Sequence, residues 1–421
     1  MNTFIAAAMH NIQKDKTLSP DLLANYRDSY LTGLLPFDYR NSTRSYIQLD
    51  DSSAIYSYDG LGVKEGSMSI VTGGTGAGKT TFLIQTMDKI LKKFPKSSCL
   101  YFDPEGGADE NKISTLARVP YLRGQIKVMS GGITNGVFFK MAQNHCDQKI
   151  QLIGNPEYMY DTGYVDVFGK PIKKLIPTII ILDSLPAMIS EEVLDGKDLP
   201  TQTFAMKQAA DNAKIFRIFN QRAVQANVIF FIVNWCEDKI DMNPFSPKKD
   251  ILTTLTGKQI YIPGGNAVKY LSSNIIYLDH KKSIDGVKDA YHVTSRIVEF
   301  NLLKTRSNAP KSAVTMLFNT ESVGYFDLFG TLLYHFIENG VAKKDGNSYK
   351  LPNYPYVKFS KDIHKFKEIL KDDLGFRIAL SKLAKEYYGS MTADSAKNGI
   401  MGDGDIDVMG KNILDRFNIE I

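Results

Sequence analysis

The segment GGTGAGKTT, Gly73 to Thr81, has the residue types and spacing of a phosphate-binding loop. Gly73, four residues and then Gly78-Lys79-Thr80 fit the pattern GxxxxGK[ST]. Glycines let the backbone amides point at phosphates, and the start of the following helix adds a favourable partial charge. Lys79 would reach the β- and γ-phosphates, and the Thr80 hydroxyl would bind Mg²⁺. The predicted ATP site comprises Gly73, Gly74, Thr75, Gly76, Ala77, Gly78, Lys79, Thr80 and Thr81; the alternative is a glycine-rich turn that binds nothing.

Two carboxylates follow apolar runs that are typical of buried strands. Asp183 ends the run TIIILD, and the carboxyl ends of such strands are where these sheets place ligands. Asp183 is therefore predicted to bind Mg²⁺ with Thr80, although an apolar run that ends in Asp also occurs by chance. Glu105, in YFDPEGGAD, would polarise a water for attack on the γ-phosphate. A solvated loop glutamate is the alternative for Glu105.

Short runs of β-branched and aromatic residues alternate with helical stretches between residues 67 and 320, which predicts an α/β fold. The first five runs are apolar almost throughout, as strands covered on both faces must be. The last two flank the polar turn TRSNAPKS and predict an antiparallel hairpin at one edge of a mainly parallel central sheet. Apolar positions spaced by three and four predict a helical pair over residues 361–388. The predicted strands are 67–73, 98–104, 178–183, 227–234, 273–279, 296–304 and 313–318.

The composition is that of an ordinary globular protein. Of the 421 residues, 43% are hydrophobic and 23% charged, and the net charge of +5 neither requires nor excludes a polyanionic partner. Cys99, Cys146 and Cys236 lack the spacing of a disulfide framework or a zinc site. No run of about 18 apolar residues predicts a membrane span, and the N-terminus lacks the basic start of a signal peptide. We therefore expect a cytoplasmic protein with no membrane partner.

Three further segments carry a family resemblance. Residues 261–273, YIPGGNAVKYLSS, are similar to the GGNALKF segment of RecA-family recombinases. Residues 302–310, LLKTRSNAP, are similar to the basic hairpin of that family, and residues 324–351 to the segment that follows it. With the phosphate loop, these segments make the chain resemble the RecA family over about 55–350, and more closely its phage UvsX branch. The resemblance implies a RecA-like P-loop ATPase core.

The sequence divides around this core. We expect the core at 51–335, an N-terminal oligomerisation segment at 1–50 that docks on an adjacent subunit, and a small C-terminal domain at 336–390. Glycines and aspartates predict a flexible, mildly acidic tail at 391–421. The segment 141–177 is longer than in the family, and no function is predicted for it.

The resemblance assigns roles to the matching residues. Glu105 takes the place of the catalytic base, and Asp109 that of an aspartate beside adenine. Lys304 and Arg306 match two basic residues that reach across a subunit interface to the neighbour's γ-phosphate, the logic of an arginine finger. Solvated charges on an edge hairpin are the alternative for this pair. The departures are Lys112, in place of an aromatic residue near adenine, and Trp235, which follows Asn234 in place of a γ-phosphate sensor.

DNA would lie on two loops, 190–203 and 235–265. The second is about thirty residues long without clear periodicity, and such loops are normally functional or disordered. Phe245 could wedge between bases beside phosphate-seeking lysines, or it could simply be an exposed side chain. Arg217, on the helix after the first loop, matches a basic residue that contacts the DNA backbone. The predicted DNA-binding residues are Arg217, Phe245, Lys248, Lys249, Gly264, Gly265 and Asn266.

The expected function is that of an ATP-dependent DNA recombinase. It would form a helical filament on single-stranded DNA, pair it with homologous duplex DNA and exchange strands in recombination, repair and recombination-dependent replication. Single-strand-binding and loading proteins are expected partners, and the host cytoplasm is the expected location if the source is a phage. Two alternatives stay open: a hexameric RecA-fold DNA helicase, and a weakly hydrolysing ATP-binding structural or mediator paralogue.

Overall fold

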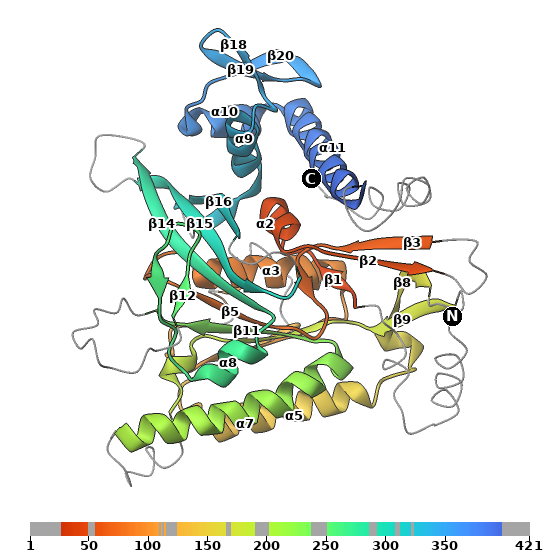
Figure 1. Ribbon diagram of the computed structural model, residues 1–421, viewed down its shortest axis with the longest axis vertical. Coiled ribbons are helices and arrows are strands. Elements are labelled where there is room, and N and C mark those ends of the chain that lie inside the picture. Colours follow the sequence, from red (N-terminus) through yellow and green to blue (C-terminus); the bar gives the residue numbers. More distant parts are fainter. Residues whose placement is uncertain are drawn as a thin grey trace.

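The computed structural model describes residues 27–48, 55–108, 111, 113–114, 124–165, 170–189, 202–236, 251–285, 293–307, 312–320 and 324–397. Its centre is a nine-stranded sheet in the order β17-β16-β15-β14-β5-β11-β10-β6-β7 (Figure 1). The strands from β14 to β7 are mutually parallel, and β15, β16 and β17 add antiparallel at one edge. The chain therefore has a mixed α/β fold with a large, mostly parallel central sheet. The strands are β5 (Met68–Gly73), β6 (Cys99–Asp103), β7 (Ile126–Ser130), β10 (Thr178–Leu182), β11 (Val228–Asn234), β14 (Asn274–Asp285), β15 (Val293–Thr305), β16 (Ser312–Asn319) and β17 (Tyr325–Asp327).

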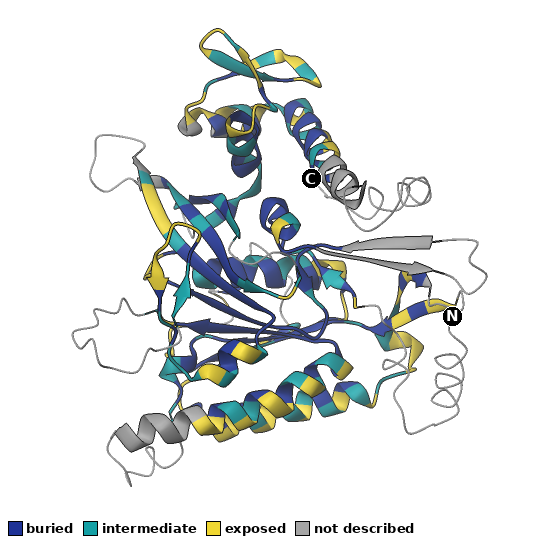
Figure 2. Ribbon diagram, viewed as in Figure 1, coloured by how far each residue is buried: buried dark blue, intermediate teal, exposed yellow. Residues whose placement is uncertain are grey.

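Strand β10 shows why its sequence is apolar throughout. Ile179 and Ile181 belong to a core on one face of the sheet, and Ile180 and Leu182 to a core on the other. The central parallel strands β5, β10 and β11 are buried along their length (Figure 2). One core packs on α3 and the other on α5, α7 and α8 (Figure 1). These helices are α3 (Lys79–Lys93), α5 (Asn135–Ile150), α7 (Gln202–Ala226) and α8 (Asn266–Leu271).

All seven predicted strands are present, and the predicted antiparallel hairpin of β15 and β16 is confirmed. The sequence did not predict the edge strands β7 and β17, whose short runs lack the continuous apolar character of the central strands. No helix in the described part of the chain is long and apolar enough to cross a membrane.

The described part of the predicted N-terminal segment packs on this chain's own core. β1 (Ser29–Tyr30) pairs with β4 (Val63–Lys64), and α2 (Leu35–Arg40) places Phe37 in the core beside α3. The Phe37 ring lies 5.3 Å from that of Phe82 and 5.7 Å from that of Phe300. Residues 29–41 thus pack on the core of their own chain, and the docking of the N-terminal segment on an adjacent subunit stays a prediction. Residues 1–26 lie outside the described residues. The hairpin of β2 (Thr43–Gln48) and β3 (Ile55–Gly60) spans the predicted boundary at residue 50.

The C-terminal unit builds a third core around Phe336, Phe359 and Phe376, to which Leu35, Leu61 and Leu317 also belong. The predicted boundary at residue 335 falls inside α9, so a division before α9 describes the packing better. The helical pair predicted over 361–388 is present as α10 and α11, and α11 continues past residue 390, into the predicted tail. The elements of this unit are α9 (Leu328–Glu338), β18 (Lys343–Asp345), β19 (Ser348–Leu351), β20 (Tyr354–Phe359), α10 (Ile363–Asp372) and α11 (Leu374–Lys397).

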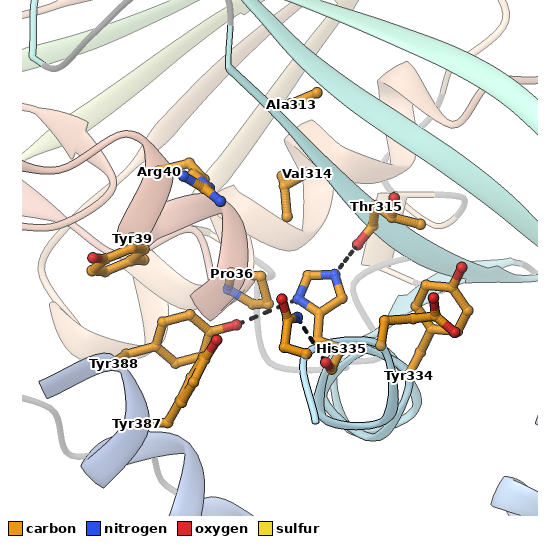
Figure 3. A pocket seen from close by; sticks show the side chains of 12 residues that line it. Pro36, Tyr39, Arg40, Ala313, Val314, Thr315, Tyr334, His335, Tyr387 and Tyr388 are labelled. Carbon is orange, nitrogen blue, oxygen red and sulfur yellow. Dashed lines mark hydrogen bonds between the residues drawn. The ribbon is translucent and has the colours of Figure 1, made fainter. Parts of the chain in front are cut away.

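A pocket of about 330 Å³ lies where α2, β16, α9 and α11 meet (Figure 3). His335 crosses this junction: its Nε2 lies 2.7 Å from the Thr315 carbonyl oxygen and its Nδ1 lies 3.4 Å from the Tyr388 hydroxyl. Burial lowers the pKa of His335, so the neutral ring donates from Nε2 to Thr315. The Tyr39 and Tyr388 rings lie 5.3 Å apart. Elements from both ends of the chain therefore meet on the sheet edge.

The long segment 141–177 completes α5 and forms an antiparallel hairpin of β8 (Met159–Val165) and β9 (Pro171–Leu175). Lys174 on β9 makes a buried 3.0 Å ion pair with Glu65. Tyr160 on β8 donates to Asp28 at 2.6 Å, next to β1. The hairpin therefore ties the N-terminal strand to the amino end of the sheet, which is a structural role that the sequence did not reveal.

Candidate nucleotide-binding site

The segment 73–81 connects β5 to α3 by a turn that only glycine fits at two positions. Gly73 has φ +148° and Gly78 has φ +89°. A Cβ at Gly73 would lie 2.3 Å from the Leu278 carbonyl oxygen, and one at Gly78 would lie 2.8 Å from Cζ of Phe326. The loop therefore curls closely over β14 and β17, and α3 begins directly after it at Lys79.

Lys79 lies folded over the loop. Its Nζ donates to the carbonyl oxygens of Gly73 at 2.8 Å and Gly74 at 2.9 Å. Burial lowers the pKa of Lys79, while Cys236, Asp183 and Glu105 oppose the shift. A phosphate group would give the ammonium a stronger, charged acceptor than the two carbonyls.

Asp183 follows β10 and faces the start of α3. Its Oδ2 accepts from the Thr80 hydroxyl at 2.7 Å and from the Tyr101 hydroxyl at 2.8 Å. Burial raises the pKa of Asp183, and these two hydrogen bonds lower it in part. The predicted metal residues Thr80 and Asp183 are thus in direct contact.

A half-buried carboxylate beside a hydroxyl suits Mg²⁺, which takes oxygen ligands and is usually held by one or two carboxylates together with substrate phosphates. Within the described ranges, no group of three or more His, Cys, Asp or Glu side chains gathers as a self-sufficient metal site. The donor set at Thr80 and Asp183 therefore fits a metal that arrives with a nucleotide.

Glu105 lies on a turn after β6, and Asp103 holds that turn. The Asp103 carboxylate accepts from the backbone amides of Gly106 at 3.0 Å and of Ala108. Glu105 itself is exposed and accepts from the Ser184 hydroxyl at 2.6 Å. Asp183 and Ser184 are neighbours in the chain and are joined by a cis peptide bond. The predicted metal residue Asp183 is thus followed directly by the residue that contacts Glu105.

The sequence predicted Lys79, Thr80, Asp183 and Glu105, and the structure brings all four together at the carboxyl end of the parallel strands. It did not predict Tyr101 or Ser184. Ser184 directly follows Asp183, and Tyr101 lies in the predicted strand before Glu105, but their contacts join segments that are about eighty residues apart in the chain.

Lys304 and Arg306 lie at the other end of the sheet. In the strand register, Lys304 is opposite Ile275, which is opposite Ile70 near the start of β5, whereas the phosphate loop follows the end of β5. Lys304 Nζ donates to the carbonyl oxygens of Lys269 at 2.6 Å and Tyr270 at 2.8 Å. Arg306 Nη2 donates to the Tyr270 carbonyl oxygen at 2.6 Å.

Both cations therefore cap the C-terminus of α8, where helix carbonyls attract positive charge. Burial lowers the pKa of Lys304 to about 8, and the nearby charge of Arg306 adds to the shift. The structure does not bring this pair to its own phosphate loop.

Gly264, Gly265 and Asn266 lead into α8. The two glycines have φ +101° and +89°, and Asn266 is exposed as the first residue of the helix. Asn234, at the end of β11, donates from its amide to the Pro263 carbonyl oxygen at 2.9 Å. The strand beside β5 is thereby joined to the segment that precedes α8. Trp235 follows with 49% of its surface exposed.

The remaining predicted site residues are Arg217 and several residues that lie outside the described part of the chain. Arg217 is exposed on α7, as a backbone-contacting residue must be. Residues 190–201 of the first predicted DNA loop and 237–250 of the second lie outside the described residues, as do Asp109, Lys112, Phe245, Lys248 and Lys249. Their predicted roles stay predictions.

A cavity of about 390 Å³ opens beside the phosphate loop. It runs from Gly76 and Thr81 to Phe318 on β16, and Arg296 on β15 lines it as well. Arg296 is not among the residues predicted from the sequence. The sequence nevertheless marks this position. Arg296 interrupts an alternating row of apolar residues that point into the core beside α3, namely Val298, Phe300 and Leu302.

No protein-family model matches the chain, and no curated protein matches it significantly in sequence.

Proposed function

We propose that the chain is a DNA-dependent ATPase with a RecA-like core that assembles on single-stranded DNA and promotes homologous pairing and strand exchange. The observation that carries the proposal is the contact between Thr80 and Asp183 at the base of a glycine-rich loop. Lys79 and Glu105 lie beside that contact. The four side chains are those that phosphoryl transfer to water requires.

Each side chain has a separate task. Loop amides would bind the phosphates, and Lys79 would exchange the Gly73 and Gly74 carbonyls for the β- and γ-phosphates. Mg²⁺, held by Thr80 and Asp183, would neutralise the charge on the phosphates. Glu105 would accept a proton from the attacking water, with its carboxylate oriented by the Ser184 hydroxyl.

The position of Lys304 and Arg306 supports an assembly. A single chain holds these cations at the opposite end of the sheet from its own phosphate loop, so a phosphate site that they complete would belong to another subunit. Because a cation at the transferred phosphate is worth about 10³–10⁵ in rate in other P-loop enzymes, ATP hydrolysis should depend on self-association. The resemblance to recombinases supplies the expectation that single-stranded DNA drives that association.

Electron microscopy with single-stranded DNA and a slowly hydrolysed ATP analogue tests the assembly. Helical filaments that also pair homologous strands support a recombinase. Closed rings that unwind a forked duplex would instead favour the helicase alternative.

The variant Glu105→Gln tests the catalytic assignment. It keeps the hydrogen bond from Ser184 but cannot accept a proton, so DNA-stimulated ATP hydrolysis should fall at least 10²-fold while ATP binding persists. An unchanged rate contradicts the role of Glu105. Negligible hydrolysis by the wild type in preformed filaments would favour the mediator alternative, which the exposed Trp235 also permits.

A further inference from the structure

Arg296 ends a row of side chains that otherwise builds the core. On β15 every second residue points toward α3, and Val298, Phe300 and Leu302 are all buried there. Arg296 is the next member of this row and pairs in register with Phe318 on β16. A guanidinium is thus placed where the pattern calls for an apolar side chain, directly beside the phosphate loop.

The hydrogen bonding of Arg296 is incomplete. Its Nη1 donates to the Gly76 carbonyl oxygen at 3.2 Å, while its Nε is buried and has no acceptor. No carboxylate among the described residues pairs with Arg296. A buried donor of a charged group without an acceptor is costly, so its presence requires an explanation such as an absent ligand.

The cavity next to Arg296 indicates which part of a nucleotide that ligand would be. Its walls include Thr80, Thr81 and Phe318, but neither Asp183 nor Glu105. Lys79 and Thr80, which would bind the β- and γ-phosphates and Mg²⁺, line one part of the cavity. From there it extends past Thr81 to Phe318 and Gly324, on the side away from Asp183 and Glu105, along the part of the loop that cradles the α- and β-phosphates.

The geometry points to Arg296 as a positioning residue that binds the nucleoside end of the nucleotide within its own chain, through an oxygen of the α-phosphate or the ribose. The inference rests on the proposed nucleotide site but not on recombination. Arg296 acts on binding, in contrast to Lys304 and Arg306, which would act on the neighbour's reaction.

The test measures Mg²⁺-dependent binding of ATP and of inorganic triphosphate to the full-length chain by calorimetry, without DNA. Arg296→Ala should raise the Kd for ATP about 10- to 100-fold, the range for losing hydrogen bonds to a charged group. Arg296→Lys keeps the positive charge but not the planar guanidinium with its several N–H donors. The Kd for ATP should therefore rise less than in Arg296→Ala. Lys282→Ala, an exposed lysine on β14, is the matched control and should bind as the wild type does.

The two ligands separate the contacts. A loss for both ligands assigns Arg296 to the α-phosphate, and a loss for ATP alone assigns it to the ribose. Wild-type affinity of Arg296→Ala for both ligands overturns the inference, provided that thermal unfolding without nucleotide shows each variant folded. Wild-type protein that binds neither ligand overturns the nucleotide site and this inference together, whereas bound ATP without filaments or pairing on DNA removes only the recombinase proposal.

Discussion

The two ends of strand β15 carry cations with opposite surroundings. Arg296, at one end, lies over the phosphate loop of its own chain and has a buried donor without an acceptor. Lys304, at the other end, is satisfied by two carbonyls of α8 and lies far along the sheet from that loop. In the proposed assembly, one strand would therefore serve two sites, with Arg296 at the nucleotide of its own chain and Lys304 at that of a neighbour. Arg296 would then contribute to nucleotide binding, whereas Lys304 would contribute to catalysis.

The largest expected effect comes from removing the distant cation. Arg306→Ala should reduce kcat of DNA-stimulated ATP hydrolysis at least about 10³-fold and leave ATP affinity unchanged, since the cation acts only on the neighbour's transition state. Steady-state kinetics check the fall in kcat, and direct nucleotide-binding measurements check that ATP affinity is unchanged.

Mixing variants sharpens the same prediction. In a 1:1 mixture of Arg306→Ala and Glu105→Gln, about a quarter of sites would combine an intact Glu105 with an intact neighbouring Arg306, because interfaces in a head-to-tail assembly join different surfaces. Hydrolysis should recover toward that fraction of the wild-type rate. A mixture as inactive as its components contradicts a shared site.

The next effect comes from the middle of the strand, which connects the two ends. Phe300 packs against Phe37, Phe82 and Phe326 with ring centroids 4.9–5.7 Å apart. Phe300→Ala should lower the free energy of unfolding by about 3–5 kcal/mol, measured by denaturant titration, because it opens a cavity in the core beside α3. Ile297→Ala, at a half-buried position on the opposite face of β15, is the comparison variant. It should lower the free energy of unfolding by less than Phe300→Ala does.

The smallest effect is a difference in pH dependence between the two ends. Because the pKa of Lys304 is lowered to about 8, its side chain is charged below that pH and loses its proton as the pH rises through it. The value of kcat/KM, which reports groups of the free enzyme, should therefore decline severalfold above pH 8. Nucleotide affinity, in which Lys304 takes no part, should show no such decline. In Arg306→Ala the decline should move to higher pH, and an unmoved profile contradicts the assignment to Lys304.

Much of the site could be predicted from the sequence because its parts are local. Gly73 to Thr81 is one continuous segment, and Asp183 and Glu105 each end an apolar strand, so strand order alone places them at one edge. Arg296 could have been found from its interruption of an alternating row. The carbonyls that hold Lys304 and Arg306 could not, because backbone acceptors carry no residue signature. Ser184 and Tyr101 were missed for a related reason: their partners are close only after the sheet has formed.

The fold outside the core was less predictable. The described N-terminal residues looked like an appendage because they fall outside the strand-helix alternation, yet Phe37 belongs to the main core. Such a long-range contact has no periodic pattern in the sequence.

The contact of Tyr39 with Tyr388 has a consequence for synthesis and folding. These rings lie near opposite ends of the described chain, so the junction around His335 can close only after nearly all of the core and the C-terminal unit have left the ribosome. Contacts of such large sequence separation form late and slow folding. Until then, the edge of β16 near Thr315 has no cover from α9 and α11, and an uncovered strand edge can pair with other chains. Full-length chains should therefore refold with less aggregation than chains truncated before α9.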